Sequence, residues 1–293
     1  RLSRTDRALK GILREAGQAA HRRRSGGGRR YDRPHTQSIR GVSMINLKTT
    51  RELRYMRDAG KISQEALLKA GEAVRPGVST LELDKIVRRT IEKAGAVPSF
   101  LGYGGFPASA CISVNNVVIH GIPSAHEILK EGDIVSIDVG AIYEGFNGDN
   151  AWTFPCGKVS EEAQKLMDAT RESLFLAIEK AVPGNRIGDI GSAVQQYVEA
   201  RNYSVVREFV GHGVGAKLHE DPSVPNYGTP GRGVRLLPGM TIAIEPMVTQ
   251  GSCEVKILKD GWTTVTKDGK LAAHFEHSIA ITPDGPVILT SLD

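Results

Sequence analysis

The sequence predicts an α+β fold made of two similar halves, with helices covering a curved antiparallel sheet. Each half contains two stretches of apolar residues at helical spacing, separated by a break at Pro76-Gly77 or Pro183-Gly184. One constant offset in residue number carries the first break to the second and also carries Gly132 to Gly239. A common offset at both ends of a long segment predicts a duplicated structural unit.

The same offset also relates two apolar strands that end in acids. The segment Gly-Asp-Ile-Val-Ser-Ile-Asp, ending at Asp138, corresponds to Gly-Met-Thr-Ile-Ala-Ile-Glu, ending at Glu245. We expect the two halves to meet along the strands that carry these two residues. Such a pairing would bring acids from both halves to one site.

Local patterns predict the elements of the first half. Apolar residues recur at intervals of three and four from Thr49 to about Val74, which indicates a helix. Ser79 can cap a second helix that ends at Gly95. A glycine-rich connection then leads into a mostly apolar strand over Ala110–Val114.

Residues 132–149 have the pattern of a hairpin that turns at Glu144-Gly145. Asp138 and Asp149 lie about equally far from this turn, so we expect them to be nearly opposite each other. Directly paired residues have Cβ atoms roughly 5 Å apart, and like charges at that distance repel. A buried pair would need a shared proton or a cation. From this stretch alone, two solvated carboxylates at the rim of a hairpin are an equal alternative.

The second half repeats the order of elements in the first. Ala163–Val182 and Ile187–Ala200 have helical spacing on either side of the second Pro-Gly break. Strands follow these helices, and one of them contains Glu276 within an apolar run.

The composition is that of an ordinary soluble globular protein. The chain has 293 residues, of which 40% are apolar and 24% charged, enough for one large core or two modest ones. No apolar run approaches the ~20 residues of a membrane span, so we expect no membrane association. The three cysteines, Cys111, Cys156 and Cys253, are widely spaced, which suggests a reducing compartment. We therefore expect a cytoplasmic protein.

The basic character of the chain belongs to its N-terminal part. Residues 1–43 contain 12 Lys and Arg against 3 Asp and Glu, whereas residues 44–293 contain 26 against 30. The acidic body gives no electrostatic support for DNA binding. We predict a basic, disordered leader over 1–43 and one folded domain over 44–293.

Three interpretations of this leader are open. Its many arginines and few acids are typical of an organelle transit peptide, which would change the compartment. It could instead be a tail that touches ribosomal RNA or another polyanion. The interpretation we favour is that it does not belong to the mature protein, because Met44 would be a natural start just before the ordered pattern.

Three residues join the two aspartates as candidate metal ligands. His212 lies in Gly211-His212-Gly213, where we expect the glycines to clear space beside the imidazole, while Glu245 and Glu276 lie at or within apolar strands. A strand acid buried without a partner is unfavourable by several kcal/mol, so a cation explains it best. Oxygen ligands with one imidazole suit Mn²⁺, Fe²⁺, Co²⁺ or Zn²⁺. Five such ligands with two potential bridges suit a pair of metals about 3.5–4 Å apart.

From Met44 to its end, the sequence resembles the type I methionine aminopeptidases. The family's five-ligand pattern matches Asp138, Asp149, His212, Glu245 and Glu276 in order. Its His-Gly-Ile-Pro loop is present at His120–Pro123, and its second substrate-contacting histidine matches His219. The short step from His212 to Glu245 leaves no room for the helical insertion of type II enzymes. The leader contains no cysteine, so we expect no zinc-finger extension of the kind that some eukaryotic type I enzymes have.

The resemblance implies the fold called pita-bread, with two pseudo-symmetric halves, and a two-metal hydrolase. It implies that Asp149 and Glu276 bridge two divalent cations (Co, Mn, Fe or Zn), that His212 and Glu245 complete one coordination sphere, and that Asp138 holds the other metal. The implied reaction removes the initiator methionine from nascent polypeptides, preferring a small second residue. A water or hydroxide between the metals would attack the first peptide bond.

The resemblance also implies roles around the scissile bond. Glu245 would carry the proton, and His120 and His219 would contact the peptide. The positions that match the methionine pocket are Tyr103, Phe106, Cys111 and Trp262, although aromatic residues and a buried cysteine are usually just core.

Two positions depart from the family pattern. Phe100 replaces a frequent cysteine and would narrow the pocket, and His274 replaces a common glutamine beside the ligands. His277 should face the other side of its strand from Glu276 and be structural.

Two alternatives to this function come from the same fold. One is a prolidase-like or aminopeptidase-P-like peptidase, which the short His212–Glu245 spacing and the His-Gly-Ile-Pro loop disfavour. The other is a binding protein that has lost its metal ligands, but all five are present. We expect a monomer whose partners are the N-termini of nascent chains, with transient ribosome contact as a further expectation.

Overall fold

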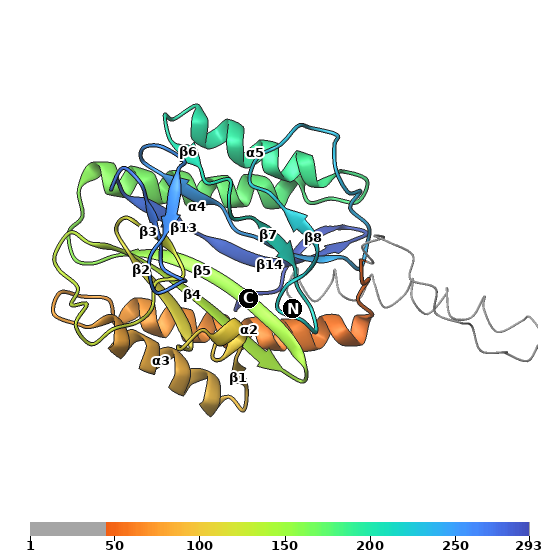
Figure 1. The fold of residues 1–293 in the computed structure, drawn as a ribbon. Coiled ribbons are helices and arrows are strands. Elements are labelled where there is room, and N and C mark those ends of the chain that lie inside the picture. The colour runs from red at the N-terminus through yellow and green to blue at the C-terminus, as the bar shows by residue number, and fades with distance from the viewer. Residues whose placement is uncertain (1–44, 293) are drawn as a thin grey trace, which may run out of the picture.

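Helices flank a large curved sheet in this protein. The computed structural model describes residues 45–292. Figure 1 shows α2 and α3 on one side of the strands and α4 and α5 on the opposite side. The predicted leader lies outside the described residues. Among residues 45–292, no helix combines the length and the apolar character that a membrane crossing requires.

The helices are α2 (Thr50–Glu72), α3 (Thr80–Lys93), the 3-10 turn η1 (Tyr103–Gly105), α4 (Glu161–Lys180) and α5 (Ile187–Glu199). The strands are β1 (Val97–Pro98), β2 (Ala110–Val114), β3 (Val117–Ile119), β4 (Ile134–Tyr143), β5 (Phe146–Pro155), β6 (Ser204–Val205), β7 (Gly211–Gly213), β8 (Glu220–Val224), β9 (Thr241–Ile244), β10 (Met247–Thr249), β11 (Val255–Ile257), β12 (Thr264–Thr266), β13 (Ala272–His274), β14 (Glu276–Thr282) and β15 (Gly285–Ile288).

The four predicted α-helices are all present, with ends close to the predicted ones. Capping boxes explain two of the starts. The hydroxyl of Thr49 accepts a hydrogen bond from the amide of Glu52, and that of Ser79 accepts one from the amide of Glu82. In return, each glutamate carboxylate accepts a hydrogen bond from the backbone amide of its N-cap residue. Reciprocal bonds of this kind satisfy two of the free N–H groups at a helix start.

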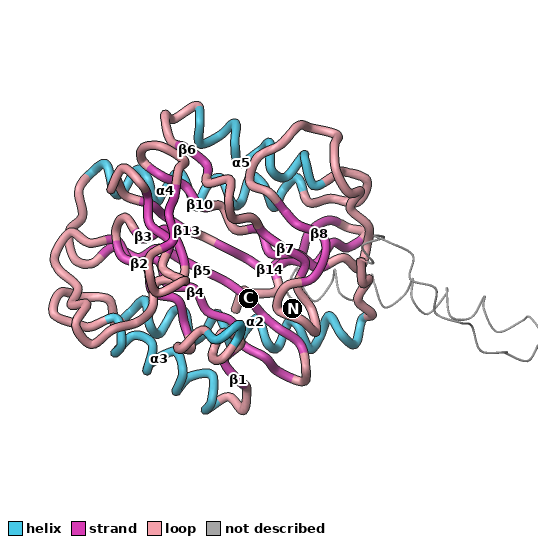
Figure 2. Tube along the Cα trace, in the orientation of Figure 1, coloured by secondary structure: helices cyan, strands magenta, loops and turns pink. Residues whose placement is uncertain are grey.

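The main sheet has nine strands and is antiparallel throughout. Its path runs β1-β4-β5-β14-β9-β7-β8, with β2 paired to β4 and β15 paired to β14. Two further three-stranded sheets, β13-β10-β6 and β11-β12-β3, lie beside it. Figure 2 shows the long strands crossing the middle of the molecule with helices on both sides.

The two halves meet at β5 and β14, where Glu276 pairs with Ala151 and His277 with Asn150. The prediction that they meet along the strands bearing Asp138 and Glu245 is therefore wrong. β4 and β9 flank the seam, one step away on either side. The acids of both halves still reach one site, because the two central strands carry Asp149 and Glu276.

The predicted duplication is visible in backbone contacts that recur at the same offset in residue number. Gly77 donates to the carbonyl of Leu129, and Gly184 donates to that of Leu236. The isolated bridge Ser79–Ile128 likewise recurs as Arg186–Arg235. Because neither contact depends on side chains, the repeat is a property of the chain path in each half.

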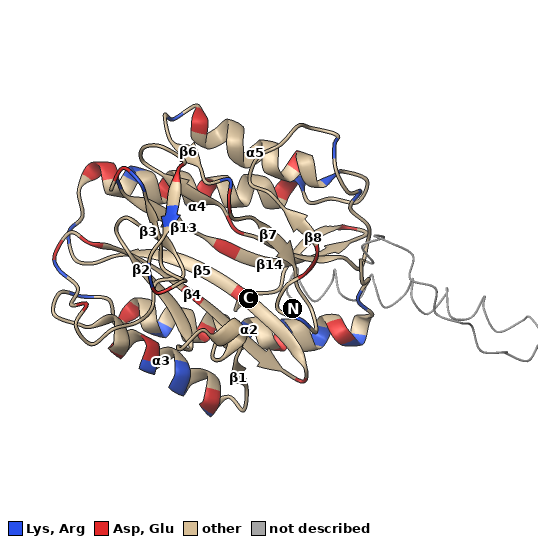
Figure 3. Cartoon of the chain, viewed as in Figure 1, with Lys and Arg blue, Asp and Glu red and all other residues tan. Residues whose placement is uncertain are grey.

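Alternation along β4 separates the core from the site. Ile137 and Val139 join the cluster that α2 and α3 bury, together with Leu67 and Leu83. Fully burying a side chain of this size stabilises the fold by about 1.5–3 kcal/mol. Asp138 lies between the two core residues, so it must point to the face of the sheet without those helices. Figure 3 shows acidic residues on the central strands, whereas most other charges lie on helices and loops.

Candidate metal centre

The hairpin that carries the two aspartates turns at Glu144-Gly145, as predicted. Both turn residues have positive φ (50° and 80°), which the two-residue hairpin turn of type I′ requires. Tyr143 therefore pairs with Phe146, and this register sets Asp138 opposite Ala151 and Asp149 opposite Gly140. The expectation that the aspartates are nearly opposite each other is wrong. They are diagonal neighbours on one face, a spacing of roughly 7–8 Å between Cα atoms.

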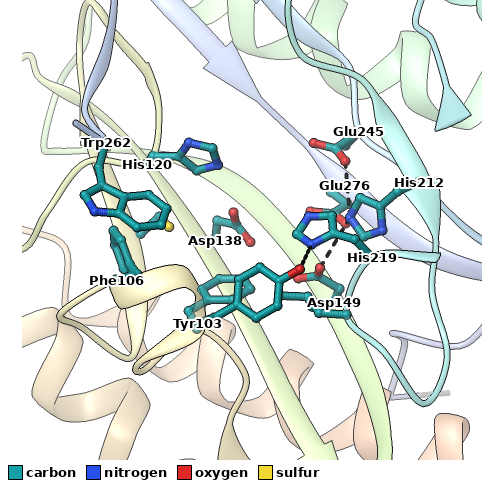
Figure 4. Close-up of a pocket in the computed structure, with 13 residues that line it drawn as sticks. Tyr103, Phe106, His120, Asp138, Asp149, His212, His219, Glu245, Trp262 and Glu276 are labelled. Atoms are coloured by element: carbon teal, nitrogen blue, oxygen red, sulfur yellow. Dashed lines mark hydrogen bonds and ion pairs between the residues drawn. The ribbon is translucent and has the colours of Figure 1, made fainter. Parts of the chain in front are cut away.

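Three other elements bring the remaining candidate ligands to this face. His212 comes from β7, Glu245 follows the last residue of β9, and Glu276 begins β14. His212 Nε2 lies 3.5 Å from Glu245 Oε1 and 3.7 Å from Asp149 Oδ2. The ligand atoms of Asp149, His212 and Glu276 all lie within 4.8 Å of one another. Figure 4 shows these side chains, with Asp138, pointing into one cavity.

The glycines beside His212 are needed by the sheet, and the expectation that they clear space for the imidazole is corrected. A Cβ on Gly211 would lie 2.4 Å from the carbonyl oxygen of Ala243, and one on Gly213 would lie 2.3 Å from that of Asp221. Neighbouring backbones thus approach β7 too closely for any side chain. The glycines hold β7 between its partners and so place His212.

The ring of His212 presents a lone pair to the acids. Its Nδ1 lies 2.9 Å from the carbonyl oxygen of Gly213, an acceptor, so Nδ1 carries the proton. Its Nε2 is then unprotonated and faces Asp149 and Glu245. Burial, and then the neighbouring imidazole of His219, lower the pKa of His212 to about 4. A neutral imidazole whose other nitrogen donates to a carbonyl is the usual form of a metal-binding histidine.

The carboxylates are crowded, and three of their oxygens have no hydrogen-bond donor within residues 45–292. Asp149 is 3% exposed and Glu276 2% exposed. Asp138 Oδ1, Asp149 Oδ1 and Glu276 Oε1 are buried and have no hydrogen-bond partner among the described residues. An unpaired buried carboxylate oxygen is strongly unfavourable.

Burial and mutual repulsion favour the protonated form of these acids. Burial raises the pKa of Asp149 to about 7. Burial, and then Asp149, raise the pKa of Asp138 well above its usual range. The pKa values of Glu245 and Glu276 are also raised, by burial first and then by the neighbouring acids. A cation would reverse these shifts, since it favours the ionised form.

The donor set fits a pair of divalent cations. Three orphaned carboxylate oxygens, a second glutamate and an unprotonated imidazole nitrogen converge within one buried cluster. Mn²⁺, Fe²⁺, Co²⁺ and Zn²⁺ all accept such a mixture of oxygen and nitrogen ligands, so the set does not select one metal.

An apolar pocket adjoins the acids. The four predicted pocket residues, Tyr103, Phe106, Cys111 and Trp262, line the same cavity as all five candidate ligands. The cavity volume is about 150 Å³. The rings of Phe106 and Trp262 meet edge to face, with centroids 5.2 Å apart. A cavity of about this size can hold a benzene ring, so it has room for a side chain as large as methionine.

Two more residues complete the apolar wall. Phe100 is 8% exposed and lines the cavity, with its ring packed over Gly140 of β4; that it narrows the pocket stays a prediction. Leu218 also lines it and belongs to the same buried cluster. Sequence reasoning missed Leu218. The only feature of the sequence that could have indicated Leu218 as a pocket residue is its position directly before His219.

His120 and His219 approach the acids from opposite sides of the cavity (Figure 4). His120 has a φ of 58°, unusual for a residue other than glycine, and its ring meets those of Phe209 and Trp262 edge to face. Burial, and then His219, lower the pKa of His120 to about 4. Burial also lowers the pKa of His219. Both rings are therefore neutral near pH 7.

His274 ends β13, a strand of a three-stranded sheet, whereas His277 lies in β14 of the main sheet, directly after Glu276. His277 is buried and bonds Thr290 through Nδ1 (2.9 Å), which agrees with its expected structural role. His274 lies against the acids, with Nε2 3.8 Å from Glu245 Oε2. The sequence analysis noted His274 because it replaces a glutamine that is common in the family, and the structure places this histidine beside the candidate ligands.

Comparison with known proteins identifies a family whose sequences match this chain. The model of metallopeptidase family M24 matches residues 54–283. The chain is 60% identical over 247 residues to methionine aminopeptidase from Clostridium perfringens, an alignment that covers 84% of this chain and 99% of the relative.

Solved structures give the same picture. The crystal structure of methionine aminopeptidase from Thermotoga maritima superimposes with a TM-score of 0.84 at 47% identity, covering 85% of this chain and all of that one. The prolidase from Pyrococcus furiosus has a TM-score of 0.68 at 24% identity over 84% of this chain and 66% of its own, a likeness of fold alone.

Proposed function

The chain belongs to metallopeptidase family M24 and, within it, to the methionine aminopeptidases, and we propose that it removes methionine from the N-termini of nascent polypeptides at the acid cluster described above. The observation that carries this proposal is the junction of two environments in one cavity. In one cavity with room for a methionine side chain, an apolar wall adjoins a buried cluster of four acids and an imidazole. The pocket would take the first side chain while the acids act on the first peptide bond.

We assign the cluster to two divalent cations, with Asp149 and Glu276 as bridges. His212 and Glu245 would complete one coordination sphere, and Asp138 would hold the other cation. The orphaned oxygens of Asp138, Asp149 and Glu276 support this assignment. When bound, the cations would lower the pKa of a bound water to near 7 and polarise the first peptide carbonyl.

The protein groups around the peptide bond have separate tasks in this proposal. Glu245 is the proton carrier, because its carboxylate lies at the edge of the cluster beside His212 and lines the substrate cavity. His120 and His219 are neutral imidazoles on either side of the cavity, and they would hydrogen-bond to the scissile peptide. A positioned donor toward an oxygen that gains charge contributes strongly to the rate.

Specificity for a chain end follows from the position of Asp138. It points into the cavity between the acid cluster and the apolar wall (Figure 4), and β2 pairs Cys111 directly with it. A free α-amine placed there would be near a carboxylate and a cation. An internal peptide bond has no such amine, so the enzyme would act at N-termini. A preference for a small second residue is a further part of this proposal.

The remaining assignments concern the chain as a whole. We propose residues 44–293 as the catalytic domain and residues 1–43 as a basic leader that the reaction does not require. The matched family region, 54–283, supports this division. We further propose a monomer that acts in the cytoplasm and meets nascent chains near the ribosome. The net acidic body argues against DNA as a partner.

A direct assay separates this function from its alternatives. Protein loaded with Co²⁺ or Mn²⁺ is offered a Met-Ala peptide and an Xaa-Pro peptide of equal length. We expect release of methionine from the first and no cleavage of the second. Preference for Xaa-Pro would indicate a prolidase-like enzyme, and cleavage of neither would indicate a binding protein.

A further inference from the structure

One buried imidazole at the acid cluster has no role in the function proposed above. His274 is 2% exposed, and its Nε2 has no hydrogen-bond partner within residues 45–292. This nitrogen lies 3.8 Å from Glu245 Oε2 and 4.0 Å from Glu276 Oε2. The ring therefore faces two of the carboxylates that we assign to the cations.

The backbone of His274 is fixed to the strand that carries Asp149. Thr153, on β5, donates its hydroxyl proton to the carbonyl oxygen of His274 (2.8 Å) and accepts from the amide of His274 (3.0 Å). Since the proton of Thr153 is committed, the hydroxyl of Ser136 donates to it (2.8 Å). The backbone from which the imidazole extends is thus held in a fixed position relative to Asp149.

Glu245 lies between two imidazoles and offers one oxygen to each. Its Oε1 is 3.5 Å from His212 Nε2, and its Oε2 is 3.8 Å from His274 Nε2. A ring on each side limits the rotation of this carboxylate. The backbone carbonyl of Glu245 is held as well, because Asn226 Nδ2 donates to it at 2.8 Å.

The two imidazoles differ in what their other nitrogen does. His212 donates through Nδ1 to Gly213, which leaves Nε2 free to bind a cation. For His274, no such acceptor for Nδ1 is found in the described part of the chain, and Nε2 faces two carboxylates. When a cation holds Glu245 and Glu276 in their ionised form, an N–H is stable between these two acceptors, whereas a lone pair there is repelled. A histidine that ligates a metal almost always donates through its second nitrogen, so this arrangement favours a donor over a ligand.

We propose that His274 is a positioning residue, which orients the carboxylates of Glu245 and Glu276 toward the cations through its Nε2–H. This inference rests on the proposed function, which makes the two acids metal ligands. Groups that hydrogen-bond to metal ligands typically account for a factor of about 10–100 in metal affinity. Loss of the N–H should therefore weaken metal binding without removing a ligand.

The test compares His274→Leu with His274→Gln in the full chain. Leucine keeps the apolar bulk and removes the donor, whereas the glutamine amide retains an N–H. Metal-stripped proteins are titrated with Co²⁺ by calorimetry, and the visible absorption of bound Co²⁺ is recorded. We expect His274→Leu to bind Co²⁺ about 10–100-fold more weakly. His274→Gln should recover most of that loss, and all three spectra should show the same number of ligands.

His277→Leu is the matched control, because it also removes a buried imidazole close in sequence to Glu276, but this ring bonds Thr290 and packs against Trp152 and Phe175, and none of the three is a candidate ligand. Its thermal stability should fall while its Co²⁺ affinity stays at the wild-type level. Unchanged affinity in His274→Leu, or equal losses in the leucine and glutamine variants, would overturn the positioning role. A Co²⁺ spectrum that loses a nitrogen ligand in both variants would make His274 a ligand and also overturn it. Absence of metal binding in the wild type would instead refute the proposed function.

Discussion

The hydroxyl oxygen of Tyr103 lies 2.7 Å from Nδ1 of His219, so one hydrogen bond joins the glycine-rich turn η1 to the segment between β7 and β8. The two rings also pack together, with centroids 5.3 Å apart. Tyr103 is 45% exposed, and both residues line the candidate substrate cavity. The bond therefore connects the outer wall of the cavity to an imidazole proposed to contact the peptide.

Tyr103→Phe removes this bond and leaves the ring in place. A single hydrogen bond contributes about 0.5–1.5 kcal/mol net, so kcat/KM on a Met-Ala peptide should fall roughly 2–10-fold. The melting temperature should hardly change, since the side chain is half exposed. Tyr55→Phe is the control, because Tyr55 makes an exposed bond to Arg51 on α2. Equal kcat/KM values for Tyr103→Phe and the wild type would contradict a role for the bond.

The proposed bridges should be indispensable for metal binding. Asp149→Asn and Glu276→Gln each replace a buried, unpaired oxygen by a neutral amide. We expect both variants to lose metal and turnover together, as measured by elemental analysis after dialysis and by methionine release. Asp84→Asn is the control, because Asp84 is a buried carboxylate that accepts from the amides of Ser109 and Ala110 away from the cavity. Near-normal metal content in either bridge variant would refute the assignment.

The sequence predicted the parts of the fold that depend on local patterns. Helices α2 to α5 have strong apolar periodicity, and the repeat of the two halves appears in the contacts of Gly77 and Gly184. The seam between the halves was not predictable in this way. β4, β5, β9 and β14 each have an acid in the strand or directly after it, so the pattern does not say which pair is central.

Register and packing also limited the prediction of the site. The offset of Asp138 from Asp149 depends on which two residues form the turn, and a shift of one changes every pair along the hairpin. The residue types identified all five candidate ligands, because acids in apolar strands are rare without a cation. Leu218 carries no such signal, since a leucine in a loop is ordinary until the fold brings it against Phe106.

The metal-free protein should lose stability as the pH rises above 6.5. The pKa of Asp149 is raised from its ordinary value near 3.8 to about 7 in the folded state. The contribution of this carboxyl to the free energy of unfolding is therefore fully present below pH 3.8 and is lost as the pH rises through 7. The buried imidazoles have the opposite effect, because the pKa values of His120, His212 and His277 are lowered to about 4 and that of His274 to about 3. Their effect fades as the pH rises past 6.5, the ordinary pKa of histidine, and above it the four raised acids dominate the trend.

Urea unfolding of chelator-treated protein at about pH 6.5 and about pH 8 measures this effect. We expect a lower midpoint at the higher pH and a smaller difference in Asp149→Asn. Saturating Mn²⁺ should reverse the trend, since a cation binds the ionised acids and gains affinity as they lose protons. Equal midpoints at both pH values without metal would contradict the crowded acid cluster.

Phe100 should set the width of the apolar pocket. Phe100→Ala opens space beside Gly140, and Phe→Ala substitutions in a core typically destabilise by about 3–5 kcal/mol. A wider pocket should raise kcat/KM for a peptide with N-terminal phenylalanine relative to methionine by about 10-fold or more, since each added carbon in such a pocket is worth about 1–3 kcal/mol. Phe175→Ala, at an exposed position on α4, is the control. An unchanged substrate ratio would place the limit of the pocket elsewhere.

Deletion of residues 1–43 should leave turnover of short peptides almost unchanged, because the residues of the described part of the chain that line the candidate site all lie within 100–276. Extending the deletion through Lys48 should lower both the stability and the activity of the protein. The amide of Lys48 donates to the carbonyl of Gly239, and its ammonium forms a buried ion pair with Glu220, next to His219. Removing one partner of a buried pair typically destabilises by about 3–5 kcal/mol.

Lys48→Met in the full chain tests the effect of losing the ion pair with Glu220 without the effect of shortening the chain. We expect this variant to lose stability and kcat/KM, because Glu220 would be left without the ammonium of Lys48, directly beside His219 in the candidate site. Thermal unfolding and methionine release, measured on the two deletions and this variant, give the comparison. A large loss of activity on short peptides after deletion of 1–43 alone would show that the leader belongs to the catalytic fold.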